Sequence, residues 1–354
     1  MTDKRWEQLG KVLIHDSLKV KPGEKVMIAM YETETYPLTL ACYAEVIKAG
    51  GFPQVQFMSE GLKHQVLRYG SEEQIGWIPE IESYGMEWAD CYLALRGAFN
   101  MSECWDIPNE KIAKYQKAMG VISSMRWQKT RWALIRVPNE RFAQQAHVSY
   151  DKIMDMFFNA CLCMDWDKEL KEYQRIKARL EQGSEIHLVG RGTDITFRFD
   201  DNPWTPEVAA DNIPGGEIFV TPKWETVNGV ISYEFPATIG GKIINGLSYT
   251  FKDGYVTEIR CDNDLDYVTA ILDSDEGSRR MGEFAFGMNK YIDTVTTDIL
   301  IDEKFGGTIH TALGRPYDGS YYSAIHWDII KDTRTEAKIY LDGELIFENG
   351  KFLF

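Results

Sequence analysis

Two segments near the end of the chain contain histidines in settings that suit metal binding. His326 and Asp328 are separated by one residue in the segment 323–330, whose apolar pattern predicts a strand. Side chains at positions i and i+2 of a strand point to the same face, so this imidazole and this carboxylate are expected to lie together while Trp327 points away. His310 lies in a glycine-rich segment, Phe305–Gly314. Either segment alone is more often an ordinary strand or a surface loop than a metal site.

Two acidic residues in apolar surroundings strengthen this expectation. Glu217 follows the turn Pro214-Gly215-Gly216 and begins an apolar strand. Glu283 lies within Gly282–Gly287, an apolar segment that we assign to a helix over residues 277–286. A buried carboxylate must be paired, hydrogen-bonded or bound to a metal ion. The residues with chemical potential therefore gather in the second half of the chain.

Several other catalytic and nucleotide-binding patterns are missing from the sequence. There is no HExxH and no GxSxG, which argues against zincins and α/β-hydrolases. Neither GxGxxG nor GxxxxGK[ST] follows the first predicted strand, so a phosphate-binding loop has no support.

Alternating short strands and helices predict the fold of the first half. A helix over 37–48 that stops at Gly50-Gly51 separates the first two strands. This alternation is typical of a doubly wound, parallel α/β sheet. The predicted strands are 25–30, 52–57, 91–95, 120–123 and 132–137.

The pattern changes after a charged helix over 167–180 that ends at Gly183. Turn signals at Asp253-Gly254 and Asp342-Gly343 predict hairpins, and a helix is expected over 264–272. We therefore expect two domains: an α/β domain over 1–184, and a strand-rich α+β domain over 185–354.

Charge and composition limit the function classes. The chain has 39 Lys and Arg against 54 Asp and Glu, which argues against nucleic-acid binding. Residues 185–354 hold 29 acids and 15 bases, a net charge of −14, whereas 1–184 hold 25 and 24. The acidic half suits cations.

The six cysteines have no spacing typical of zinc or disulfide frameworks, so we expect reduced thiols. No signal peptide and no apolar run of about 20 residues is visible, so we expect a cytoplasmic protein that does not enter a membrane.

Several segments of the chain, in the order in which they occur, resemble those of the aminopeptidase T/S family of dinuclear metallopeptidases. The resemblance extends over nearly the whole chain, and the combination of NIPGGEIFVTP, HTALG and HWD is specific although each piece alone is not. The segments that carry it are Leu18–Glu24, Phe157–Trp166, Gly192–Asp194, Asn212–Pro222, Gly282–Gly287, Asp302-Glu303, His310–Gly314 and His326–Asp328.

The resemblance implies a set of metal ligands and one further site residue. Glu283 would bridge two ions, Glu303 would complete one shell, and Tyr317 matches a tyrosine of the family's site. The loop over 315–324 is shorter than in most members. Because this loop normally shapes the substrate side of the site, the resemblance predicts the ligands more firmly than the substrate. The implied metal ligands are Glu217, Glu283, Glu303, His310, His326 and Asp328.

Carboxylates and imidazoles of this kind suit two ions of Zn²⁺, Co²⁺ or Mn²⁺ about 3.5–4 Å apart, which would activate a shared water and polarise a carbonyl. The expected function is a metal-dependent aminopeptidase, a homodimer by resemblance, acting on short peptides that pass an N-terminal capping domain. Three alternatives stay open: a metal hydrolase acting on small amides or ring amines, a mononuclear-iron dioxygenase of the dihydroxypyridine type, and a catalytically silent binding protein.

Overall fold

The computed structural model describes residues 3–100, 102–200 and 202–354. The contacts divide the chain into two compact units, Met1–Cys163 with Ala209–Ile213, and Met164–Val208 with Pro214–Phe354. Helix α9 (Trp166–Leu180) belongs to the second unit, whereas the sequence analysis counted it with the first domain. The roles expected of the two domains stay predictions.

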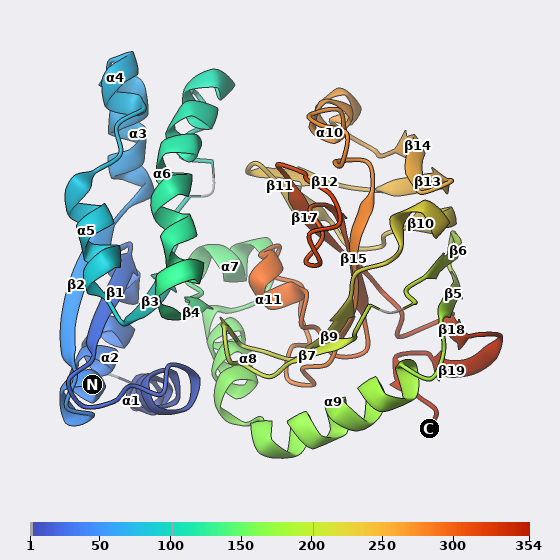
Figure 1. Ribbon diagram of the computed structural model, residues 1–354, viewed down its shortest axis with the longest axis horizontal. Coiled ribbons are helices and arrows are strands. Elements are labelled where there is room, and N and C mark those ends of the chain that lie inside the picture. Colours follow the sequence, from blue (N-terminus) through green and yellow to red (C-terminus); the bar gives the residue numbers. More distant parts are fainter. Residues whose placement is uncertain (1–2, 101, 201) are drawn as a thin grey trace. The chain divides into compact units, whose positions relative to one another are not determined.

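The first unit is built on a parallel sheet, which confirms the expected α/β class (Figure 1). Strands β1 and β3 are buried along almost their whole length, as expected when helices cover both faces of a parallel sheet. The strand order is β2-β1-β3-β4-β8. The strands are β1 (Lys25–Tyr31), β2 (Phe52–Met58), β3 (Cys91–Arg96), β4 (Arg131–Arg136) and β8 (Asn212–Ile213).

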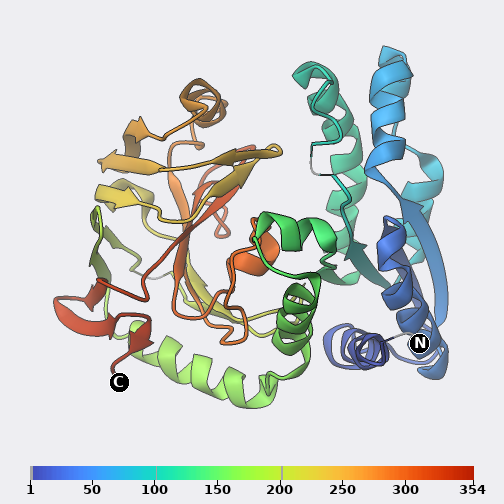
Figure 2. The same ribbon diagram turned by 180° about the vertical axis from the view of Figure 1, so that it is seen from behind.

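The helical connections run in two directions across this sheet. From β1 the chain passes to β2 on one side, then returns across β1 to reach β3. Because such crossovers are right-handed, α2 lies on one face and α3–α6 on the other. Figures 1 and 2 show α3, α4 and α6 side by side. The helices are α1 (Arg5–Lys11), α2 (Tyr36–Lys48), α3 (Glu60–Tyr69), α4 (Glu72–Ile75), α5 (Glu80–Trp88), α6 (Asn109–Lys129), α7 (Glu140–Gln145) and α8 (Tyr150–Leu162).

One predicted strand of this unit is wrong. Residues 120–123 lie in the middle of α6. Short apolar runs do not distinguish a strand from a buried helical segment, and here the helical surroundings decide.

The second unit contains two antiparallel sheets with a shared core. The larger sheet has the order β14-β13-β10-β6-β5-β18-β19-β20, and the smaller has β17-β16-β15-β9-β7. Aromatic side chains fill the space between them; the rings of Phe197 and Phe284, from different sheets, are 4.9 Å apart. Both predicted hairpins, β13–β14 and β18–β19, are present, and so is helix α10 (Leu265–Leu272).

The strands of the larger sheet are β5 (Glu185–Gly190), β6 (Thr193–Arg198), β10 (Asn228–Ser232), β13 (Ser248–Lys252), β14 (Tyr255–Arg260), β18 (Lys338–Leu341), β19 (Glu344–Glu348) and β20 (Lys351–Phe352). Those of the smaller sheet are β7 (Thr205–Glu207), β9 (Glu217–Val220), β15 (Met281–Gly287), β16 (Ile309–Gly314) and β17 (His326–Lys331). A separate hairpin joins β11 (Ala237–Ile239) to β12 (Lys242–Ile244).

The helix predicted around Glu283 is wrong, because these residues form the buried strand β15. Phe284 and Phe286 alternate with Glu283 and Ala285, which gives the period of two that a strand requires. Gly282 permits close contact with the neighbouring strand: a Cβ atom at this position would lie 2.5 Å from the carbonyl oxygen of Gly314. The acid therefore stands on a sheet face opposite the aromatic core.

Candidate metal centre

One face of the smaller sheet carries the acids and histidines singled out in the sequence. Glu217 begins β9, Glu283 lies on β15, His310 on β16, and His326 and Asp328 on β17. Because the strands pair in register and side chains alternate, these five side chains share one face while the aromatic residues between them enter the core. The pairs that fix the register are Glu217 with Gly287, His310 with Ala285, Glu283 with Ala312, and Asp328 with Ala312.

Six side chains that the sequence analysis proposed as ligands come together at this face. Their potential ligand atoms form overlapping groups, in each of which all atoms lie within 4.8 Å of one another. Glu283, His310 and Asp328 each belong to two of these groups, and Glu283 is the carboxylate whose two oxygens face two different imidazoles. The groups are Glu217, Glu283 and His310; Glu283, His326 and Asp328; and Glu303, His310 and Asp328.

Both imidazoles are held through their Nδ1 atoms. His310 Nδ1 lies 3.1 Å from the carbonyl oxygen of Glu303, and His326 Nδ1 lies 2.8 Å from that of Arg315. A carbonyl oxygen accepts only, so each Nδ1 carries the proton and donates it. The Nε2 atoms are thereby directed at the carboxylates. Backbone support of this kind fixes the orientation and tautomer of metal-binding histidines.

Glu283 faces both histidines with different oxygens. Its Oε1 lies 3.5 Å from His310 Nε2, and its Oε2 lies 3.1 Å from His326 Nε2. Burial alone would raise the pKa of Glu283, but hydrogen bonds and charge from the two imidazoles outweigh it and lower the pKa. Burial likewise opposes the charge on His310, yet Glu283 and Glu217 raise the pKa of His310 to about 9. The carboxylates therefore favour a positive charge at the Nε2 atoms of the two histidines.

The donor set fits divalent ions. Glu217 Oε2 and His326 Nε2 are buried, and although charged partners lie 3.1–3.4 Å away, neither atom makes a well-aligned hydrogen bond within the described part of the chain. Buried polar atoms are rarely left in this state unless a ligand satisfies them. Carboxylate oxygens with imidazole nitrogens suit Zn²⁺, Co²⁺ and Mn²⁺. Glu217, Glu283, His310, His326, Asp328 and Glu303 would hold such ions.

A lysine that the sequence analysis missed lies at the edge of this centre. Lys304 is fully buried, and its Nζ contacts Glu217 Oε1 and, at 2.8 Å, Glu303 Oε1. Burial alone would lower the pKa of Lys304, but Glu217 and Glu303 outweigh it and raise the pKa, so the ammonium stays charged. In the sequence this residue is an ordinary lysine between an acid and an aromatic residue, and nothing there signals its burial.

The segment before Lys304 determines which of two adjacent acids enters the centre. Helix α11 (Ile299–Asp302) ends with Asp302, whose carboxylate accepts hydrogen bonds from the backbone N–H and the hydroxyl of Thr296, at 2.8 and 2.7 Å. Glu303 therefore turns the other way, toward His310 and Asp328. Burial, with the charges of Glu217 and Asp328, raises the pKa of Glu303.

Tyr317 lies on the short loop between β16 and β17. Its ring centroid is 5.2 Å from that of His326 and 5.0 Å from that of Phe219, while 62% of the residue's surface stays exposed. The negative charge of Glu283, followed by burial, raises the pKa of Tyr317, which keeps its hydroxyl protonated and able to donate. The structure thus brings Tyr317 to the rim of the centre.

The sequence profile of the thermophilic metalloproteases (M29) matches residues 2–352. The chain belongs to this family. Aminopeptidase 2 of Geobacillus stearothermophilus is 23% identical over 356 residues, which cover 88% of this chain and 85% of that protein. Aminopeptidase T of Thermus thermophilus is 31% identical over 145 residues, 37% of this chain and 35% of that one.

Solved structures place the chain in the same fold as an M29 protein. The structure of wild-type AmpT from Thermus thermophilus covers 99% of both chains with a TM-score of 0.87 at 20% identity. The structure of 2,5-dihydroxypyridine dioxygenase from Pseudomonas putida covers 98% of this chain and 96% of its own, with a TM-score of 0.62 at 12% identity. The M29 match agrees with the family resemblance read from the sequence. No helix within the described residues is long and apolar enough to cross a membrane.

Proposed function

We propose that this M29 protein is a metal-dependent aminopeptidase that removes N-terminal residues from short peptides by means of two divalent ions. The observation that carries this proposal is the position of Glu283, whose two oxygens face two different imidazoles. Relatives named aminopeptidases support the reaction class. Two ions supply Lewis acidity that activates water and polarises the scissile carbonyl.

The side chains divide between two positions for ions. We assign Glu217 and His310 to the first and His326 and Asp328 to the second, and we assign Glu283 to both. Glu303, close to His310 and Asp328, is in reach to complete a shell. The carbonyls that hold the two Nδ1 atoms keep the imidazoles aimed at these positions. Zn²⁺, Co²⁺ and Mn²⁺ are the ions that this donor set favours.

Tyr317 is proposed to stabilise the charge that develops on the substrate carbonyl. A protonated phenol at the rim of the centre can donate a hydrogen bond to an oxyanion, an interaction that is stronger in the transition state than in the ground state. The substrate's N-terminal ammonium would be held by one of the carboxylates of the centre. We also expect a homodimer located in the cytoplasm, as the family resemblance implies.

A two-metal hydrolase is favoured over the dioxygenase alternative. A ring-cleaving dioxygenase needs one iron with open positions, whereas this centre has a buried carboxylate between two histidines. A hydrolase of small amides or ring amines would use the same ions, so substrates rather than metals must distinguish it from a peptidase.

The test combines metal analysis with a substrate panel. Purified protein is reconstituted separately with Zn²⁺, Co²⁺, Mn²⁺ and Fe²⁺, and bound metal per chain is measured with aminoacyl-aminocoumarin hydrolysis. N-acetylated versions of the same substrates are the control, because they lack the free amine. We expect two ions per chain and cleavage of free-amine substrates only. One iron per chain with oxygen consumption, or two ions with hydrolysis of simple amides alone, would overturn the proposal.

A further inference from the structure

A cavity of about 860 Å³ lies within the first unit at the carboxyl edge of the parallel sheet. The last residues of three adjacent strands line it: Tyr31 of β1, Met58 of β2 and Arg96 of β3. The connections after β1 and before β3 run on opposite faces, so β1 and β3 flank the point where the strand order reverses. Doubly wound sheets bind ligands outside their strand ends at this switch point.

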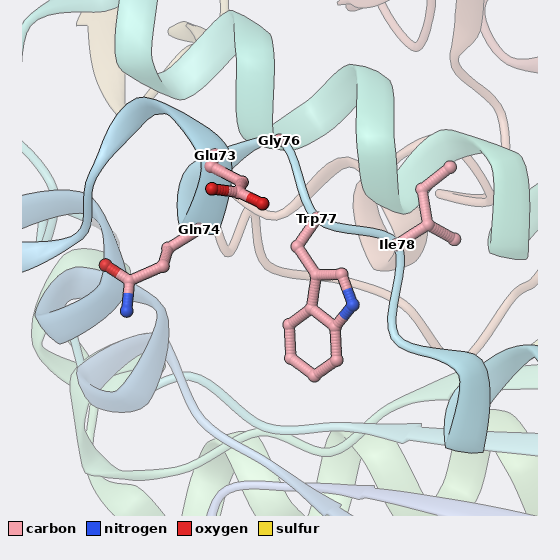
Figure 3. A pocket seen from close by; sticks show the side chains of 5 residues that line it. All are labelled: Glu73, Gln74, Gly76, Trp77 and Ile78. Carbon is pink, nitrogen blue, oxygen red and sulfur yellow. The ribbon is translucent and has the colours of Figure 1, made fainter.

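Apolar and aromatic side chains form the walls of this cavity. Phe57, Leu62, Tyr69 and Trp77 line it although 48%, 57%, 71% and 56% of their surfaces are exposed. Figure 3 shows the indole of Trp77 projecting from the turn after α4, where a smaller hollow of about 440 Å³ shares this residue with the cavity. Several large apolar side chains exposed around one opening are typical of a binding site.

Helix α6 keeps the cavity open at its middle. Gly120 lines the cavity, and a Cβ atom built on it would meet no atom within 4 Å. Glycine inside a helix costs about 1 kcal/mol relative to alanine. The other lining residues on α6 include Gln116 and Ser123 as well as the larger Tyr115, Met119 and Ile122. Gly120 therefore leaves room at one point of a wall that is otherwise formed by longer side chains.

Two arginines give the cavity a positive end. Arg96 ends β3, and Arg126, on α6, is only 7% exposed with its guanidinium stacked 4.5 Å from the ring centroid of Trp132. Burial, together with the charge of Arg96, lowers the pKa of Arg126, and Asp211 acts against this effect. Of the other charged residues in the lining, Glu60 is paired with Lys63 at 2.9 Å. Glu82 is a half-buried acid whose pKa is raised by burial.

From this geometry we propose that the switch-point cavity binds a small amphipathic anion, with a flat apolar body against Phe57, Tyr69 and Trp77 and an acidic group directed at Arg96 and Arg126. Arginine binds carboxylates and related anions in bidentate fashion, and the positive charge of both guanidinium groups favours an anion at this end of the cavity. The proposal concerns residues of the first unit alone and does not depend on the peptidase function.

The test uses two fluorescent probes with related aromatic bodies and the full-length protein. One is 8-anilinonaphthalene-1-sulfonate, and the other, N-phenyl-1-naphthylamine, lacks the sulfonate. A hydrogen bond to a charged group corresponds to about tenfold or more in affinity, so we expect the sulfonate to bind one per chain with a Kd at least about tenfold lower. 3-Phenylpropionate should displace it, and 3-phenylpropionamide should not.

Four variants separate the cavity from general surface binding. Gly120→Phe should abolish probe binding by filling the cavity, while Gly120→Ala, which changes the backbone in the same way, should keep it. Arg126→Met should remove the preference for the sulfonate, and Arg68→Gln, a charge removed from α3 outside the lining, should not. Circular dichroism checks folding. Equal affinity for both probes, or unchanged binding in Gly120→Phe, would overturn the proposal. So would a change in oligomeric mass on Gly120→Phe without saturable probe binding, because the groove would then be an interface between copies.

Discussion

Replacing Lys304 by methionine tests whether the buried ammonium and the expected metal ions stabilise the same carboxylates. Lys304 Nζ contacts both Glu217 and Glu303, and all three side chains are buried. Removing one partner of a buried ion pair costs about 3–5 kcal/mol, because the remaining charge stays desolvated and unpaired. Methionine keeps most of the length of the side chain and removes the ammonium, with its charge and its N–H donors.

The expected loss of folding stability in Lys304→Met depends on whether metal is bound. In metal-free protein, about 3–5 kcal/mol corresponds to a fall in Tm of roughly 6–20 °C for a folding unit of 150–250 residues. Divalent ions would supply positive charge beside the same carboxylates, so the loss should be smaller in metal-loaded protein. By the thermodynamic cycle, each 1.4 kcal/mol of difference means about tenfold tighter metal binding in the variant.

The assay measures thermal unfolding of wild type and Lys304→Met with excess EDTA and with saturating Zn²⁺ or Co²⁺, and competition titrations give the metal affinity. Lys331→Met is the matched control: Lys331 is equally buried and pairs with Glu234 at 2.8 Å, outside the centre. Its loss of stability should be the same with and without metal. An equal loss for Lys304→Met in both conditions, or weaker metal binding in that variant, would refute the reasoning.

Four further predictions concern the proposed reaction and assembly. Glu283→Gln should lower activity by orders of magnitude while circular dichroism stays that of wild type, and two tightly bound metals with normal turnover would contradict the bridging role. Tyr317→Phe should lower kcat by about 10²–10³ with little change in KM; a change in KM alone would mean that Tyr317 binds substrate. Di- to pentapeptides should be cleaved much faster than the N-terminus of a folded protein if the N-terminal domain narrows access, and sedimentation should give twice the chain mass of 40.7 kDa if the protein is a homodimer.

Much of the fold follows from patterns that are local in the sequence. An apolar run predicts the strand over 25–31, and Gly50-Gly51 predicts the end of the helix that follows it. The bounds of both elements could therefore be predicted within a residue or two. The pair His326 and Asp328 shares a face because their spacing matches the period of a strand. The helix predicted over 277–286 is wrong, because so short an apolar run does not distinguish a helix from a strand. The partners that make residues 281–287 a strand, β9 and β16, lie far away in the sequence.

The site could be proposed only in part from the same patterns. The six acids and histidines lie on four strands and one helix end, and their meeting depends on strand order and register, which spacing along the chain does not determine. The family resemblance supplied that connection. Lys304 escaped because in the sequence it is an ordinary lysine that follows two acids. Its burial depends on contact with Glu217, which belongs to another segment.

Counting charges in the centre links Lys304 to the chemistry as well as to stability. Glu217, Glu283, Glu303 and Asp328 contribute four negative charges when metal is bound, two divalent ions would contribute four positive ones, and Lys304 adds one more. The surplus of one positive charge stabilises the uncharged carbonyl of the bound peptide only weakly, and it stabilises the negative charge that develops on the carbonyl oxygen more strongly. We therefore expect Lys304→Met, assayed below its melting range and saturated with metal, to lower kcat while KM changes little. An unchanged kcat would restrict the role of Lys304 to the stability of the metal-free fold.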